Sequence, residues 1–416
     1  MNYILINAIV YIILWIVFYT RIKRFNLFMI VWSGYTLSSL MSYISISMNL
    51  YYYPLSFVYS EFSIQPLLYT LAVYLIISLF FYKVDERKIN LLDININTPV
   101  YRSFVNYSLL LFFVVSILKI YESIALETVS SYGEIYQGMH DEETKTLLRD
   151  ILYSNWFLRI LSGAGGAYCT TMAPLMMMYF FKKIAIKKKL TFYYLFCILI
   201  IVIPVLLQGV INASRGNLFF SFFQLLFYYI IICHYLSKSV RRKISLIAII
   251  AVILFSAISY GITESRVETR GSKYTAFEDI MLYFGQPTLN ACYFQDRVKN
   301  HPMGKRFLDI RDSEKNTLSF TDYWEHKTGC QGQIQLFKTC YGDLYVEFGI
   351  IGSFVFIIFY TLIWNRLVIS HYQNPMYIPF LWLYFNFLIF GIFNFKVVKL
   401  ADTWVILLII LCIYIN

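Results

Sequence analysis

A lone arginine, Arg215, stands between two of the most apolar stretches of the sequence. It belongs to the segment INASRGN (211–217), which follows LTFYYLFCILIIVIPVLLQGV and precedes LFFSFFQLLFYYIIIC. A guanidinium at membrane depth is costly and usually marks a ligand or a pathway. Asn212, Ser214 and Gly216 form a polar, flexible turn in which a cation and neighbouring amides can hold an anion. The alternative is that Arg215 simply reaches the membrane interface at a tight turn.

Two more arginines follow a later apolar run, in the segment GITESRVETRGSKY (261–274). Arg266 and Arg270 are four residues apart, so on a continuing helix they share a face. Glu264 and Glu268 have the same spacing on a different face. Guanidinium groups bind phosphate oxygens in bidentate fashion, so this cluster is a candidate diphosphate site. The alternative is a solvated helix end with Glu–Arg pairs.

A pair of acids enters another apolar run, in the segment KTCYGDLYVEFGIIG (338–352). Asp343 and Glu347 are four residues apart, and Glu347 is expected about one turn inside the membrane. Such a carboxylate can position an arginine or accept a proton. Gly349 and Gly352 permit close helix packing. The alternative for Glu347 is a purely structural Glu–Arg pair.

The composition places these residues in a membrane protein. Of the 416 residues, 59% are hydrophobic and only 14% are charged, against about 25% charged in a typical soluble domain. The formal net charge of +11 is expected to reflect basic residues in cytoplasmic loops. We therefore predict an all-α polytopic membrane protein that contacts the lipid bilayer and no nucleic acid.

Long apolar stretches and basic clusters predict the topology. About 11 spans of roughly 20 residues each are expected, over 3–20, 27–48, 64–82, 104–120, 160–181, 190–211, 217–236, 244–262, 341–364, 376–395 and 401–415. Basic clusters follow the first, third, fifth and seventh spans, at 21–24, 83–88, 182–189 and 237–243. Because basic loops stay in the cytoplasm, the N-terminus is expected outside and the C-terminus inside.

The chain (1–416) is expected to form one membrane domain with two larger outer loops, 121–150 and 263–340. The second loop is polar and holds many of the remaining basic residues. Cys330 and Cys340 can form a disulfide there in an oxidising compartment, the alternative being free thiols. The sequence has no acidic D-x-D triplet, H-E-x-x-H or G-x-x-x-x-G-K-[ST] motif, so neither a metal nor a nucleotide cofactor is expected.

Together these segments resemble a known family. The order is a serine–arginine–glycine turn, a large outer loop, and then D-L-Y-x-x-F-G-x-x-G at the start of a span. This order is similar to that of the Wzy-type O-antigen and capsular oligosaccharide repeat-unit polymerases, over residues 200–365. The related O-antigen ligases often have a histidine at the start of the corresponding helix, where this chain has Lys338.

The resemblance implies a metal-independent glycosyltransferase with a GT-C-like bundle and no cofactor. It would join oligosaccharides carried on undecaprenyl diphosphate at the periplasmic face of a bacterial inner membrane, and a protein that regulates chain length is a possible partner. Cations lower the barrier to departure of a diphosphate, and the candidates are Arg215, Arg266 and Arg270. The acceptor hydroxyl needs a base, and the candidates in order of preference are Asp343, Glu347, Glu264 and His326.

Two alternative functions remain at this stage. One is an O-antigen ligase or another glycosyltransferase that uses lipid-linked sugars, with the same arginine chemistry and a different acceptor. The other is a flippase or exporter of lipid-linked glycans, which is not an enzyme. An exporter needs charges inside the bundle, and the spans contain few: Lys119, Arg159 and Glu347.

Overall fold

The structure is a computed structural model of the chain. It describes residues 2–50, 63–91, 98–127, 156–211, 215–269, 273–306, 320–329 and 339–393. Within these ranges every regular element is a helix, in agreement with the all-α class predicted from composition. Short 3-10 turns cover Phe81–Lys83, Glu86–Lys88, Cys233–Tyr235, Ile369–His371 and Pro375–Tyr377.

The chain groups into two units, which are described separately. Unit 1 comprises Met1–Val84, Glu278–His371 and Leu383–Val397, and unit 2 comprises Asp85–Phe277, Tyr372–Trp382 and Val398–Asn416. The single membrane domain expected over 1–416 stays a prediction. Each unit thus combines segments that are far apart in the sequence.

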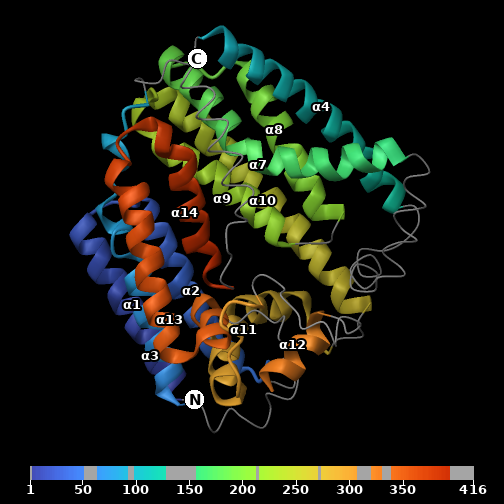
Figure 1. The fold of residues 1–416 in the computed structure, drawn as a ribbon. Helices are drawn as coiled ribbons and strands as arrows, with labels where there is room; N and C mark the ends of the chain where they lie inside the picture. The colour runs from blue at the N-terminus through green and yellow to red at the C-terminus, as the bar shows by residue number, and fades with distance from the viewer. Residues whose placement is uncertain are drawn as a thin grey trace. The chain divides into compact units, whose positions relative to one another are not determined.

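Unit 1 holds the first and last helices of the described chain. Its elements are α1 (Asn2–Ile22), α2 (Leu27–Ser47), α3 (Ile64–Ser78), most of α11 (Ala276–Arg297), α12 (Phe320–Thr328), α13 (Thr339–Leu367) and the second half of α14 (Ile378–Phe390). α1 packs along α2, and α3 packs along α13 (Figure 1).

Unit 2 is a bundle of long helices. Its elements are α4 (Pro99–Glu127), α7 (Trp156–Lys187), α8 (Phe192–Ile211), α9 (Arg215–Ile232) and α10 (Lys238–Thr269). α8 is central, because it packs against α4, α7 and α9 (Figure 1). This packing brings polar residues of several helices close to one another.

Six helices are long and apolar enough to cross a membrane, among the residues that the structure describes. They cover Tyr3–Ile22, Leu27–Ser47, Pro99–Ile124, Leu218–Tyr235, Lys238–Thr269 and Thr339–His371. Shorter apolar helices cover Ile64–Ser78, Phe192–Gln208 and Pro375–Phe390. These helices support the assignment as a membrane protein, and their positions agree with the apolar stretches of the sequence.

The exact number of spans stays a prediction. α7 is a continuous helix over the expected span 160–181, but it is not among the six. Its first half carries serine, glycine and threonine in place of long apolar side chains. The expected span 401–415 lies outside the described residues, as does 128–150, the greater part of the first expected outer loop.

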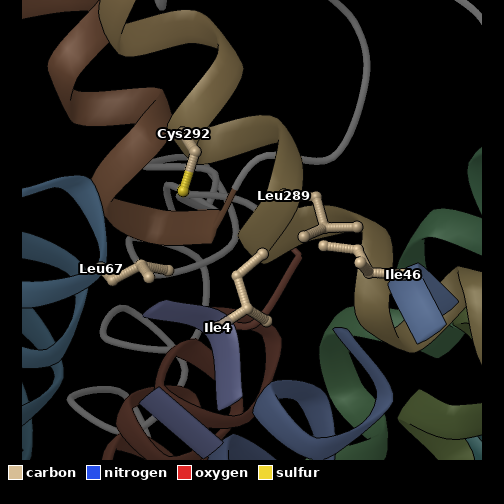
Figure 2. Packing of buried hydrophobic residues seen from close by; sticks show 5 residues of the cluster. All are labelled: Ile4, Ile46, Leu67, Leu289 and Cys292. Carbon is tan, nitrogen blue, oxygen red and sulfur yellow. The ribbon is translucent and has the colours of Figure 1, made fainter. Parts of the chain in front are cut away.

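The segment 263–340 is not simply a polar loop. α10 continues to Thr269, and α11 and α12 follow within the segment. Much of α11 is buried in unit 1, where Leu289 and Cys292 pack against Ile4, Ile46 and Leu67 of the first three helices (Figure 2). Averaging hydropathy along the sequence hides this burial, because polar residues are interspersed among the apolar ones.

α11 and α2 approach very closely at Gly285. The hydroxyl of Ser38 donates to Phe284 O at 2.8 Å, and that of Ser42 donates to Gly285 O, also at 2.8 Å. A Cβ on Gly285 would lie 2.7 Å from the backbone carbonyl of Met41. Only glycine therefore fits between the two backbones without a shift of one helix.

Replacing Gly285 by alanine is expected to destabilise unit 1, because the added methyl group overlaps backbone atoms that cannot rotate away. The overpacking is expected to cost about 1–3 kcal/mol and to lower the thermal midpoint of the purified protein in detergent. Gly261→Ala is the matched control, because a Cβ there would have no neighbour within 4 Å. Equal midpoints for the two variants would contradict the close approach.

Candidate functional site

α9 and α10 form an antiparallel pair in unit 2. Their contacts occur at three levels along the pair, at Tyr229 with Ser245, Phe222 with Phe255, and Leu218 with Ile262. As residue numbers fall along α9, they rise along α10. The start of α9 therefore lies beside the end of α10.

This register brings two of the predicted phosphate-binding residues to the same end of the helix pair. Arg215 is the first residue of α9, three positions before Leu218. Arg266 is in the last turn of α10, four positions after Ile262, and is 7% exposed. The two backbones are therefore level with each other. Arg270, the third predicted residue, lies outside the described residues.

The length of α10 indicates the depth of this end in a membrane. The helix has 32 residues, which at 1.5 Å per residue is about 48 Å, against about 30 Å for the hydrocarbon core. Its first turns carry the exposed basic residues Arg241, Arg242 and Lys243. If these lie at one interface, the opposite interface falls near Thr263. Arg266 then lies close to the membrane surface.

The acidic candidate on α10 points away from the arginine. Glu264 and Glu268 are both exposed, whereas Arg266 between them is buried. This arrangement follows from the helical period, because residues two apart point to nearly opposite sides. The sequence predicted the two glutamates and the arginine on different faces.

A second charged cluster lies in unit 1, around the predicted residues Asp343 and Glu347. Arg306 donates from Nε to Glu347 Oε1 at 2.8 Å and from Nη2 to Asp343 Oδ1 at 3.2 Å. It also donates to the main-chain carbonyl of Asp343 at 3.3 Å. The Glu347 side chain is fully buried, and the other two are 9% exposed. This is the Glu–Arg pair that the sequence left as the structural alternative for Glu347.

A tight turn supplies the other hydrogen bond to the Glu347 carboxylate. The turn runs from Pro302 to Lys305, and Gly304 N donates to Glu347 Oε2 at 2.7 Å. Met303 N donates to the main-chain carbonyl of Glu347 at 2.9 Å. Met303 has a φ of 57°, which is unfavourable for a residue with a side chain. The turn therefore depends on the bonds it makes to Glu347.

A break in α13 explains why the turn docks there. Gly349 has φ 66° and ψ −170° inside the helix, a conformation essentially restricted to glycine. The carbonyls at the end of the first helical segment thus lose their intrahelical donors. Val346 O accepts instead from His301 Nδ1 at 3.1 Å. The Gly349 predicted to allow close packing also creates this docking surface.

The end of α11 is attached to the same segment of α13. Tyr341 donates from its hydroxyl to Gln295 Oε1 at 2.8 Å, and Tyr345 donates to the main-chain carbonyl of Gln295 at 2.7 Å. Two tyrosines four residues apart therefore share one partner. The D-L-Y-x-x-F-G-x-x-G motif is in this way the docking surface for α11 and the turn that follows it.

The remaining predicted residues are a histidine and two cysteines. His326 is on α12 and is exposed. Cys340 is buried on α13, and Cys330 lies outside the described residues, so their disulfide stays a prediction. Within the described part of the chain, no group of three or more His, Cys, Asp or Glu residues is arranged to hold a metal ion.

Arg306 and His301 were not found from the sequence. Arg306 was one of many basic residues in the segment 263–340, and its partner Glu347 is 41 positions away. No local spacing connects the two. The only available signal was the expectation that a buried Glu347 requires a cation, which does not indicate which one.

No protein-family model, no curated protein and no solved structure matches the chain. The arginine pair belongs to unit 2 and the acidic cluster to unit 1.

Proposed function

We propose that the protein is an oligosaccharide repeat-unit polymerase, a glycosyltransferase with a GT-C-like bundle that acts on glycans carried by undecaprenyl diphosphate. The observation that carries the proposal is the register of α9 and α10, which brings Arg215 and Arg266 level at one end of two apolar helices. Two cations at the end of a lipid-facing helix pair suit a diphosphate on a polyprenyl tail. The motif resemblance to the Wzy-type polymerases supports the same assignment.

In the proposed reaction, the hydroxyl of an acceptor glycan attacks the anomeric carbon that carries the diphosphate. A glycosidic C–O bond forms, the bond to the diphosphate oxygen breaks, and the acceptor proton passes to a base. Negative charge grows on the leaving diphosphate, and fixed cations stabilise it in the transition state. Arg215, Arg266 and Arg270 have this role in the proposal.

The hydrogen bonds of the predicted carboxylates narrow the choice of the base. Both carboxylate oxygens of Glu347 accept hydrogen bonds, from Arg306 and Gly304, which favours a holding role for this residue. Asp343, Glu264 and His326 keep the role of candidate bases. Glu264 is the one that shares unit 2 with the arginines.

The proposal includes the cellular setting expected from the topology. The protein would lie in a bacterial inner membrane with its N-terminus in the periplasm and its C-terminus in the cytoplasm. The arginine end of α9 and α10 would then face the periplasm, where lipid-linked repeat units are joined. A protein that regulates chain length would be a partner in the same membrane.

An exporter is less well supported than an enzyme. Lys119 and Glu347, two of the charges expected inside spans, each have a partner of opposite charge, Glu122 and Arg306. An exporter would need charged groups along a path through the bundle, whereas the two proposed arginines whose backbones are described lie level at one end of α9 and α10.

Reconstitution in liposomes tests the function. Purified protein with lipid-linked repeat units and no membrane gradient is expected to yield glycans of two or more repeats on gels. Adding lipid A–core acceptor separates a ligase, which would transfer single units to the core. Movement of labelled substrate between leaflets without any new glycosidic bond would show an exporter and refute the proposal.

A further inference from the structure

Unit 2 contains a buried triad of polar side chains outside the arginine pair, formed by Lys119, Glu122 and Ser162. Lys119 Nζ on α4 donates to Glu122 Oε2 at 2.9 Å and to Ser162 Oγ of α7 at 2.7 Å. The hydroxyl of Ser162 donates in turn to Glu122 Oε1. Lys119, Glu122 and Ser162 are all 3–4% exposed. The triad is thus a closed set of hydrogen bonds between two helices.

The triad lies at the same end of unit 2 as the arginine pair. Ser162 is near the start of α7, and a Cβ on the neighbouring Gly166 would be 3.6 Å from both Lys119 Cε and Gln208 Oε1. Gln208 is in the last turn of α8, directly before the connection to Arg215. Two residues earlier, Leu206 packs on the Leu218–Ile262 contact of α9 and α10. The last turn of α8 therefore connects the triad to the arginine end.

A buried ion pair in a span calls for a functional explanation. Removing two charges from water costs several kcal/mol per ion, so apolar residues of the same volume often stabilise a protein equally well or better. Charged groups inside membrane spans are rare and mark functional sites. Ser108 and Tyr168 already join α4 and α7 by a hydroxyl pair at 2.7 Å. Neutral groups can thus hold these helices together without the charges.

We propose that Lys119 is a further cation of the diphosphate site, beside the three arginines, and that Glu122 and Ser162 hold it until the leaving diphosphate replaces the Glu122 carboxylate. This inference rests on the proposed function. A sugar–diphosphate–lipid carries about two negative charges, and the departing lipid diphosphate gains one more. The three arginines of the proposed site bind the charge already present on the substrate, and Lys119 offsets the charge that develops as the bond between the sugar and the diphosphate breaks. A cation recruited at that moment stabilises the transition state and the product more than the substrate.

Because the diphosphate and the Glu122 carboxylate compete for Lys119 in this proposal, substitutions of Lys119 and of Glu122 should change the affinity for undecaprenyl diphosphate in opposite directions. Lys119→Met removes this additional cation, so affinity for undecaprenyl diphosphate is expected to fall about 30-fold. Glu122→Gln removes the competing carboxylate and keeps the hydrogen bonds, so affinity is expected to rise about threefold or more. A structural pair predicts instead that both changes lower stability and affinity together.

Binding of undecaprenyl diphosphate and undecaprenyl monophosphate to the detergent-purified full chain tests the inference. The loss of affinity in Lys119→Met and the gain of affinity in Glu122→Gln are both expected to be large for the diphosphate and small for the monophosphate. Lys119→Met/Glu122→Gln is the folding control, because it removes both charges at similar volume and is expected to keep the thermal midpoint while lacking the gain in affinity. Ser108→Ala is the matched control on the same two helices and is expected to leave both affinities unchanged.

The outcomes separate this inference from the proposed function. If the wild-type protein polymerises repeat units but Glu122→Gln fails to tighten diphosphate binding, the exchange is wrong and the polymerase proposal stands. If Lys119→Met binds the diphosphate as well as wild type does, Lys119 is not a cation of the site. If the wild-type protein neither polymerises repeat units nor prefers the diphosphate to the monophosphate, both proposals fail.

Discussion

Replacing Arg215 or Arg266 by alanine is expected to lower the rate of polymer formation about 100-fold or more. In the proposed site, each change removes one of the cations that stabilise the charge developing on the leaving diphosphate. The helix pair itself is expected to remain folded, because its contacts at Leu218–Ile262 and Phe222–Phe255 do not depend on either guanidinium. The measurement is the initial rate of glycan extension by purified variants in liposomes.

Lysine substitutions test whether the planar guanidinium group is needed in addition to its positive charge. Arg215→Lys and Arg266→Lys are expected to recover only part of the rate, because an ammonium cannot form the planar, bidentate contact of a guanidinium with phosphate oxygens. Arg242→Ala is the matched control, since Arg242 is an exposed arginine near the opposite end of α10. Wild-type rates in Arg215→Ala or Arg266→Ala would remove that residue from the proposed site.

The sequence predicted the helices better than it predicted how they meet. Continuous apolar runs such as those of α1 and α10 identify membrane helices, because the apolar content of a span is a local property. The level placement of Arg215 and Arg266 is a property of helix register. It depends on side chains such as Leu218 and Ile262 that do not differ from others in the same runs.

The segment 263–340 shows a different limit of the sequence. Its polar composition predicted a loop, whereas α11 packs Leu289 and Cys292 into unit 1. α11 has a mixed composition in which polar residues such as Thr288 and Asn290 are buried together with apolar ones, so average hydropathy does not indicate that the helix is buried. The pairing of Arg306 with Glu347 is a contact between segments 41 positions apart. It requires the fold, because neither residue has a local pattern that identifies its partner.

Glu347→Ala is expected to destabilise unit 1 by about 3 kcal/mol. The change leaves Arg306 buried with only part of its negative partner charge, and it removes the acceptor of the Gly304 amide. The turn at Met303 then loses the bonds that offset its unfavourable backbone conformation. The measurement is the thermal midpoint in detergent, with Glu268→Ala, an exposed acid, as the control that is expected to change stability by less than about 0.5 kcal/mol.

Glu347→Gln separates a holding role from a catalytic one. Glutamine retains one oxygen that can accept from Gly304 or Arg306, so a partial loss of stability is expected, and polymer formation per folded molecule should remain near the wild-type value. Arg306→Met combined with Glu347→Gln is expected to recover stability relative to Arg306→Met alone, because no uncompensated glutamate remains buried. A Glu347→Gln protein that melts like wild type but makes no polymer would contradict the holding role. Glu347 would then be a candidate base on the same terms as Asp343.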